Sequence, residues 1–144
     1  MQAQDIMRSK VQYVSETTTL RELSHAFRRY SVTTLAVVDD QTRLVGVVNE
    51  DDLLRAMMPS YSELHDNLNY MQDYEYLEDR AQEVENLAVR EIMIRGTISV
   101  PPTAPLLRLV SLFLLKSYSH IPVVDRGKII GVVTRTDICE LMFN

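Results

Sequence analysis

The chain has 144 residues, of which 46% are hydrophobic and 24% are charged, a composition that excludes a disordered or fibrous protein and fits a globular fold. Its formal net charge of −5 disfavours general attraction to nucleic acids and to membrane surfaces, because both are anionic. No apolar run approaches the roughly 18 residues of a membrane span, and the N-terminus does not resemble a signal peptide, so we expect a cytoplasmic protein without nucleic-acid or membrane partners.

The N-terminal third of the chain combines short apolar runs with one stretch of helical periodicity. A short strand is expected over 11–14, and apolar residues then recur at helical spacing over 20–30. Apolar β-branched runs at 35–38 and 44–48 flank a polar stretch, which predicts a β-hairpin. A second helix is expected to begin at about Glu50.

The segment 59–88 is acidic and has no counterpart elsewhere in the chain. It holds eight carboxylates against one arginine, Arg80. Two apolar stripes at helical spacing predict two amphipathic helices. The stripes comprise Leu64, Leu68 and Met71, and then Leu77, Ala81, Val84 and Ala88. These helices either pack on the rest of the protein, as such stripes usually do, or form a docking arm for a basic partner.

The C-terminal third repeats the order of elements of the first. A short strand is expected over 98–100, and the following two prolines end it because proline cannot donate to a sheet ladder. An apolar stripe over 106–114 predicts a helix, and the runs at 121–124 and 129–133 predict a second hairpin. Its turn contains Gly127, which suits a positive φ. A final helix follows the hairpin.

The two thirds are copies of one unit. Ile6-Met7 returns as Ile92-Met93, and Val37-Val38-Asp39 returns as Val123-Val124-Asp125. The offset is 86 residues before the hairpin turn and 85 after it, so the copies differ by one residue in a loop, where such a change is tolerated. A duplicated unit implies a cleft between its copies, which is the first place to look for a function.

Each copy resembles a cystathionine β-synthase (CBS) domain. The shared features are the Ile-Met pair, the strand ending in Val-Val-Asp, and a Gly-hydrophobic-hydrophobic strand that runs into a helix with an aspartate. The resemblance implies an α+β fold with two pseudo-symmetric β-α-β-β-α CBS repeats, 1–58 and 89–144, that form one Bateman module around the acidic helical insertion 59–88. It also implies a regulatory protein that binds adenosine-containing ligands between its repeats and forms a disc-like homodimer.

The segment after Gly131 carries the candidate ligand chemistry of the second copy. Thr134, Arg135 and Thr136 offer hydroxyls and a cation at a helix start, where free N–H groups favour an anion such as phosphate. Asp137 suits the diol of a ribose, by analogy with dinucleotide-binding folds. By resemblance, the ligand is AMP, ADP, ATP or a related adenosyl compound. Its adenine would contact Thr97, Ile98, Ser99, His120, Ile121 and Pro122.

A second interpretation of this motif needs no ligand. Thr134 and Asp137 also have the spacing of a capping box, which starts a helix without any bound molecule. The two roles are compatible, because a threonine that caps the empty helix can exchange its hydrogen bond when a phosphate arrives.

The first copy differs from the second in this motif. It keeps the aspartate as Asp52 but has Asn49, Glu50 and Asp51 where the second copy has its threonines and arginine. Carboxylates repel phosphate in a partly desolvated cleft. We therefore expect a second, weaker site at Asn49 and Asp52 that is empty or takes an uncharged ligand. A divalent cation at Asp51 would reverse this expectation, and the carboxylates equally suit a solvated first turn of a helix.

Other candidates for chemistry are weak. The three histidines lie in different segments without the spacing of a metal site, and no serine or cysteine has a recognisable base near it in the sequence. We therefore expect no metal site and no enzymatic activity. The single cysteine, Cys139, falls on an apolar helical pattern and is expected to be buried.

Two functions from different classes remain. The first is a stand-alone regulatory module that binds an adenosine-containing nucleotide between the repeats and signals its ligand state to an unknown protein partner. The alternative is a structural or interaction protein that acts through the acidic insertion and has vestigial clefts. Apolar helix faces over 53–58 and 138–143 predict a homodimer in either case.

Overall fold

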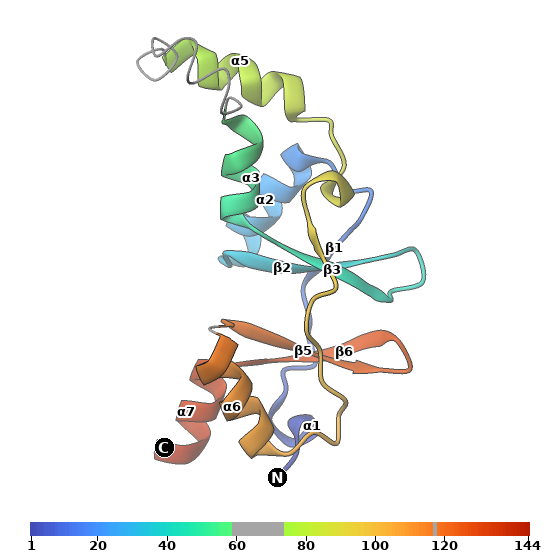
Figure 1. The fold of residues 1–144 in the computed structure, drawn as a ribbon, viewed down its shortest axis with the longest axis vertical. Helices are drawn as coiled ribbons and strands as arrows, with labels where there is room; N and C mark the ends of the chain where they lie inside the picture. Colours follow the sequence, from blue (N-terminus) through green and yellow to red (C-terminus); the bar gives the residue numbers. More distant parts are fainter. Residues whose placement is uncertain (59–73, 117) are drawn as a thin grey trace.

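The computed structural model describes residues 1–58, 74–116 and 118–144. These residues form two stacked units, each with a β-sheet on its inner side and helices on its outer side, so that the two sheets face each other (Figure 1). Among the described helices, none is both long enough and apolar enough to cross a membrane.

The first unit contains the predicted hairpin and both predicted helices of the first copy. Its elements are β1 (Tyr13–Ser15), α2 (Leu20–Tyr30), β2 (Thr34–Val38), β3 (Leu44–Asn49) and α3 (Glu50–Met57). Strand β1 is parallel to β2, and β2 is antiparallel to β3. Thr19 caps α2 by accepting a hydrogen bond from the backbone N–H of Glu22, which fixes where the helix begins.

The second unit contains the second predicted hairpin between two helices. Its elements are α6 (Leu106–Lys116), β5 (His120–Asp125), β6 (Lys128–Thr134) and α7 (Arg135–Phe143). The hairpin turn has positive φ at both central residues, 54° at Arg126 and 81° at Gly127, as a tight two-residue turn requires. The positive φ predicted for Gly127 is therefore confirmed.

The strand predicted over 98–100 is reduced to one bridging residue. Val100 donates to the carbonyl of Pro122 at 3.0 Å, and its own carbonyl accepts from Val124 at 2.9 Å. The ladder stops there because Pro101 and Pro102 have no N–H to donate. In the first copy, where serine and glutamate stand at these positions, the same pairing continues as β1.

The leading segments of the two copies are exchanged between the units. Residues 1–8, with helix α1 (Ala3–Ile6), pack on the second unit, where the N–H of Ala3 donates to Ala104 at 2.8 Å. Residues 89–95 pack on the first unit through η2 (Val89–Glu91) and β4 (Ile94–Arg95), and β4 pairs with β3. Each copy thus completes its fold with a segment from the other.

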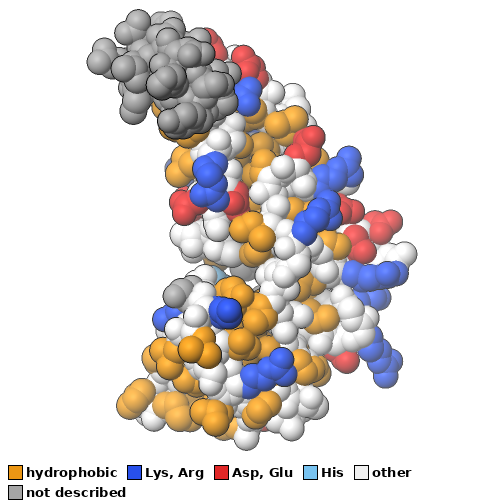
Figure 2. Space-filling model, in the orientation of Figure 1, with side chains coloured by type: hydrophobic (Ala, Val, Ile, Leu, Met, Phe, Trp, Pro, Cys, Tyr) orange, Lys and Arg blue, Asp and Glu red, His pale blue; other side chains and the backbone are white. Residues whose placement is uncertain are grey.

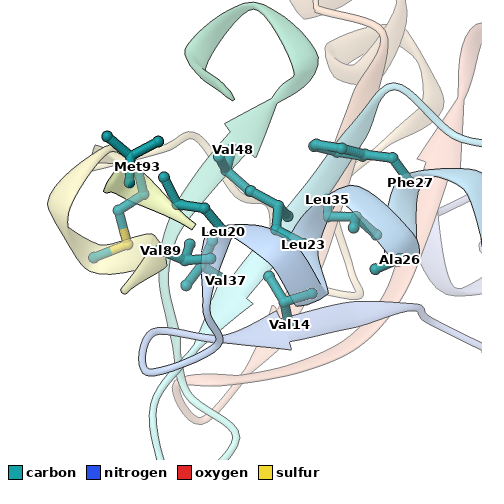
Figure 3. Close-up of a cluster of buried hydrophobic side chains, with 11 residues drawn as sticks. Val14, Leu20, Leu23, Ala26, Phe27, Leu35, Val37, Val48, Val89 and Met93 are labelled. Carbon is teal, nitrogen blue, oxygen red and sulfur yellow. The ribbon is translucent and has the colours of Figure 1, made fainter. Parts of the chain in front are cut away.

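Each unit has its own hydrophobic core, and the exchanged segments contribute to it. In the first core, Val89 and Met93 pack with residues of α2, β2 and β3 (Figure 3). In the second core, the fully buried Ala3 packs among residues that include Leu109 and Ile121. Each core therefore packs beneath one of the two sheets that face each other.

Within the acidic segment 59–88 the structure describes residues 74–88, and helix α5 (Tyr74–Val84) makes up most of them. It contacts α3, and its Val84 is buried in the first core. Leu77, which was predicted on the same stripe, is 43% exposed. The first predicted stripe, with Leu64, Leu68 and Met71, lies outside the described residues.

The expectation that Cys139 is buried is wrong, because its side chain is exposed. Of the residues of α7 only Ile138 is buried, and Leu141 and Met142 are 39% and 53% exposed. The apolar pattern of α7 therefore extends around the outer side of the helix, where no other part of the described chain buries it.

Candidate functional site

A cavity of about 600 Å³ lies between the inner faces of the two sheets, where the molecular surface is hollowed (Figure 2). Equivalent positions of the two copies line it in pairs. These pairs include Val11 with Thr97, Gln12 with Ile98, Thr34 with His120, Ala36 with Pro122, and Asn49 with Thr134. The two predicted sites thus open into one pseudo-symmetric cavity instead of two separate clefts.

Thr134 lies at the second-unit end of the cavity and caps α7. Its Oγ1 accepts from the N–H of Asp137 at 3.1 Å, and Oδ2 of Asp137 accepts from the N–H of Thr134 at 3.0 Å. The predicted capping box is therefore confirmed, and it fixes the start of the helix next to the cavity.

Asp137 also forms an ion pair that crosses from one copy to the other. Its Oδ1 accepts from Nε of Arg8, and this oxygen lies 2.8 Å from Nη2 of the same guanidinium. Burial by itself raises the pKa of Asp137, whose side chain is only 10% exposed, but the hydrogen bonds from Arg8 and Thr134 outweigh it and lower the pKa. Asp137 is consequently an ionised carboxylate behind the cavity wall, and Arg8 itself lines the cavity.

His120 adds a neutral polar group to this end. Burial lowers the pKa of its imidazole, and the nearby positive charge of Arg8 lowers it further. Its Nδ1 lies 2.9 Å from the hydroxyl of Ser119, within hydrogen-bond distance. At neutral pH the ring therefore offers a hydrogen-bonding edge and an uncharged face to a ligand.

The first-unit end of the cavity has the same architecture but a different charge pattern. Asn49 caps α3 through the N–H of Asp52 at 3.1 Å, and the buried Asp52 pairs with Arg55 of its own helix at 2.6 Å. Ile94 lies on the cavity wall at the position equivalent to Arg8. This end therefore has no counterpart of the Arg8 cation from a leading segment.

The model of the CBS domain matches residues 3–59 and 89–144 of the chain. The protein belongs to the CBS domain family. Its two repeats form the tandem pair that the sequence resemblance implied, with the predicted α+β fold.

Curated and solved relatives span nearly the whole chain. The uncharacterized protein MJ1426 of Methanocaldococcus jannaschii is 26% identical over 155 residues, which cover 99% of this chain and 91% of that protein. The structure of CBSX2 of Arabidopsis thaliana in complex with AMP has a TM-score of 0.74 and 26% identity, and covers 98% of this chain and 95% of that one. The CBS pair of MJ0100, solved with 5′-methylthioadenosine and S-adenosyl-L-methionine, shares the fold at a TM-score of 0.70 and 20% identity, covering 99% and 95% of the two chains.

The CBS cavity brings together some of the predicted site residues and leaves others aside. Those on its wall are Thr97, Ile98, His120, Pro122, Thr134 and Asn49. Ser99 lines a smaller adjacent cavity of about 170 Å³. Ile121 is fully buried in the second core, and Asp52 is occupied by its cap and by Arg55.

Arg135 is held away from the CBS cavity in this structure. Its guanidinium donates to the backbone carbonyls of Tyr118 at 2.9 Å and Phe113 at 2.6 Å, and lies over the Phe113 ring at 5.7 Å. It thereby satisfies one carbonyl in the last turn of α6 and one in the segment that follows the helix. Thr136 is exposed in the first turn of α7 and is not on the cavity wall.

Sequence reasoning missed the cations of this CBS cavity, Arg8 and Lys10, which both line its wall. They precede the first predicted strand, in a stretch that carried no motif of its own. One signal was present in the sequence: Met7 is followed by arginine, whereas Met93 is followed by isoleucine. Because the leading segments are exchanged, this difference places an arginine at the second-unit end of the cavity and an isoleucine at the first-unit end.

Proposed function

We propose that this CBS pair is a regulatory module that binds an adenosine-containing nucleotide in the cavity between its repeats and passes its ligand state to a partner protein. The observation that supports it most is the composition of the second-unit end of the cavity. There the cation Arg8 and the hydroxyl of Thr134 adjoin a neutral His120 and the apolar surfaces of Ile98 and Pro122. The binding of AMP by CBSX2, which is similar over nearly its whole length, supports the same class of ligand.

The proposed ligand pose follows from the chemistry of each group. Adenine is flat and largely apolar, so we place it against Ile98 and Pro122, as the sequence predicted. Asp137 lies behind the cavity wall and is held by Thr134 and Arg8, so it accepts from the ribose hydroxyls only when Arg8 releases its Oδ1. The phosphate lies toward Thr134 at the start of α7, where the helix dipole favours an anion, whereas Thr136 is outside the cavity wall. Arg135 joins it only by releasing the carbonyls of Phe113 and Tyr118.

Regulation would arise because both sheets line the cavity. A nucleotide that contacts the two units at once binds best to one spacing between them, and it shifts the population toward that spacing. The outer helices move with their sheets, so a partner that contacts these helices experiences the change. CBS-pair proteins are generally regulatory modules and not enzymes, and we propose no catalytic step here.

Nucleotide binding is tested by thermal unfolding and calorimetry with AMP, ADP, ATP, adenosine and S-adenosylmethionine, with GMP as the base control. A ligand at 100 times its dissociation constant should add about 2.7 kcal/mol to the stability. Asp137→Asn should weaken binding. Asp52→Asn is the matched control, since it removes a carboxylate from the same capping position of the first repeat. The proposal fails if no adenosine compound binds, or if both variants weaken binding equally.

The outer face of α6 and α7 supports the homodimer that the sequence predicted. Leu107, Leu114 and Leu115 are 77%, 72% and 78% exposed, and Phe143 is 89% exposed. Orange apolar side chains gather over this part of the second unit (Figure 2). The equivalents of the three leucines on α2 are arginines, namely Arg21, Arg28 and Arg29. We propose that this leucine face meets the same face of a second copy, which sedimentation velocity would reveal as a dimer.

Helix α5 supports a second candidate function, contact with a basic partner. Its carboxylates Glu78, Asp79 and Glu83 are exposed, and Arg80 forms an ion pair with Glu83 at 3.0 Å. Replacing Glu78 and Asp79 by glutamine and asparagine leaves the cavity unchanged. Loss of partner capture in this variant, with nucleotide binding intact, would favour the interaction function over nucleotide sensing.

A further inference from the structure

Arg8 is the cation at the second-unit end of the cavity, and its backbone is fixed while its side chain is accessible. The N–H of Arg8 donates to Val132 at 2.9 Å, and the N–H of Val132 donates back to Arg8 at 3.0 Å. The side chain is 60% exposed and lines the cavity. The guanidinium therefore starts from a defined point and can reorient without moving the segment that carries it.

The ion pair with Asp137 uses only some of the hydrogen-bond donors of Arg8. Nε and Nη2 both approach the same oxygen, Oδ1, whereas a guanidinium has five N–H donors. Asp137 retains the N–H of Thr134 on its other oxygen. The carboxylate is thus held in place by the helix cap even when Arg8 turns away.

The pseudo-symmetry shows that this cation is specific to one end of the cavity. Ile94 pairs with Val47 in the same way as Arg8 pairs with Val132, but it carries no charge. Asp52, the equivalent of Asp137, takes its arginine from its own helix, at position 55. The second-unit end therefore has a cation at the position where the first-unit end has Ile94, and this cation shares a cavity wall with Thr134.

We propose that Arg8 exchanges partners when a ligand binds, pairing with Asp137 in the empty cavity and with the phosphate of a bound nucleotide, and that it thereby sets the preference for nucleotides over nucleosides. This inference rests on the proposed nucleotide function. The exchange keeps both groups paired: Asp137 accepts the ribose hydroxyls as Arg8 leaves, and the phosphate offers Arg8 a higher negative charge and more acceptor oxygens than the carboxylate.

The test compares the affinities of AMP and adenosine, measured by calorimetry, for the wild type, Arg8→Gln, Arg8→Lys and Arg95→Gln. Arg8→Gln should weaken AMP binding about tenfold or more, because a charge-assisted hydrogen bond is lost, and leave adenosine binding nearly unchanged. Arg8→Lys should keep part of the preference. Arg95→Gln removes the same charge from the other leading segment, at an exposed position outside the cavity, and should have no effect.

The ratio of the two affinities separates ligand contact from structural damage. A merely structural role would weaken both ligands equally, and that result would overturn the inference, as would an unchanged or tighter AMP affinity in Arg8→Gln. If Arg95→Gln weakened AMP binding as much as Arg8→Gln does, the effect would be one of general electrostatics, and the inference would also be overturned. If the wild type binds neither AMP nor adenosine, the proposed function fails and the inference fails with it, an outcome that is distinct from binding without discrimination.

Discussion

The contact between Gly131 and Met7 gives a sharp prediction about the exchanged segments. A Cβ added to Gly131 would overlap Sδ of Met7 and lie 2.8 Å from its Cγ and 3.0 Å from its Cβ. The backbone of Met7 is held by its hydrogen bond to Ala3 at 2.9 Å and by the adjacent pairing of Arg8 with Val132. Gly131→Ala must therefore force the Met7 side chain out of its position against the second core.

The magnitude follows from this geometry. Overpacking of a fitted core costs about 1–3 kcal/mol, and we expect Gly131→Ala to fall in that range in urea unfolding. Met7→Ala alone should cost about 2 kcal/mol, since Met7 is only partly buried. In the double variant the clash with Cγ and Sδ is absent and only the 3.0 Å contact with Cβ remains, so its cost should be close to that of Met7→Ala alone. The coupling energy should therefore approach the cost of Gly131→Ala, about 1–3 kcal/mol, and be favourable.

The first repeat supplies the contrast. A Cβ on Gly46 would lie 2.7 Å from the backbone carbonyl oxygen of Ile94 and 3.0 Å from Sδ of Met93. A carbonyl in a paired strand cannot rotate away, so Met93→Ala should not rescue Gly46→Ala. Additive effects of Gly131→Ala and Met7→Ala, or equal rescue in both repeats, would refute the reasoning that the leading segments lock the units by these contacts.

Three further predictions concern the helix starts and the outer face. Hydrogen bonds lower the pKa of Asp137 in the folded protein, so its ionised form stabilises the fold above the unfolded pKa of about 3.9, and this contribution is lost as the pH falls through the lowered value. The free energies of unfolding of the wild type and Asp137→Asn should therefore differ at neutral pH and converge in acid. A difference that stays constant with pH would contradict this. Thr134→Ala should cost about 1 kcal/mol in urea unfolding through loss of the cap, whereas Thr136→Ala, at an exposed position, should cost less than about 0.5 kcal/mol. Leu115→Glu should yield a monomer in sedimentation velocity and Arg29→Glu, its equivalent on α2, should not; a monomeric wild type would remove the basis for the proposed interface.

The local features of this fold were predictable because each depends on neighbours in the sequence. β-branched runs on either side of a polar turn predict a hairpin, and a glycine in that turn, such as Gly127, predicts a positive φ. The capping box depends on residues three positions apart, so Thr134 and Asp137 were sufficient to predict it.

The remaining features depend on contacts between distant segments. Ile6-Met7 and Ile92-Met93 are identical pairs, so the sequence does not distinguish a segment that packs on its own copy from one that is exchanged. The partner of Asp137 could not be predicted for that reason, since Arg8 is 129 residues away. The predicted burial of Cys139 was wrong for a related reason. Apolar periodicity predicts that a helix face is buried, but it does not tell whether the residues that bury it belong to the same molecule.

The exchange of leading segments has a consequence for how such a protein can be divided. A cut anywhere between 58 and 89 would strand Ala3 and Val89, both fully enclosed in the intact chain, on the wrong fragment. Each fragment would lack a piece of its own interior and expose a strip that belongs to the other. A protein with a single copy of the repeat would lack the same core residues, and could complete its core only by exchanging leading segments with a second molecule. In a chain that contains both copies the exchange is intramolecular, so it does not depend on the protein concentration.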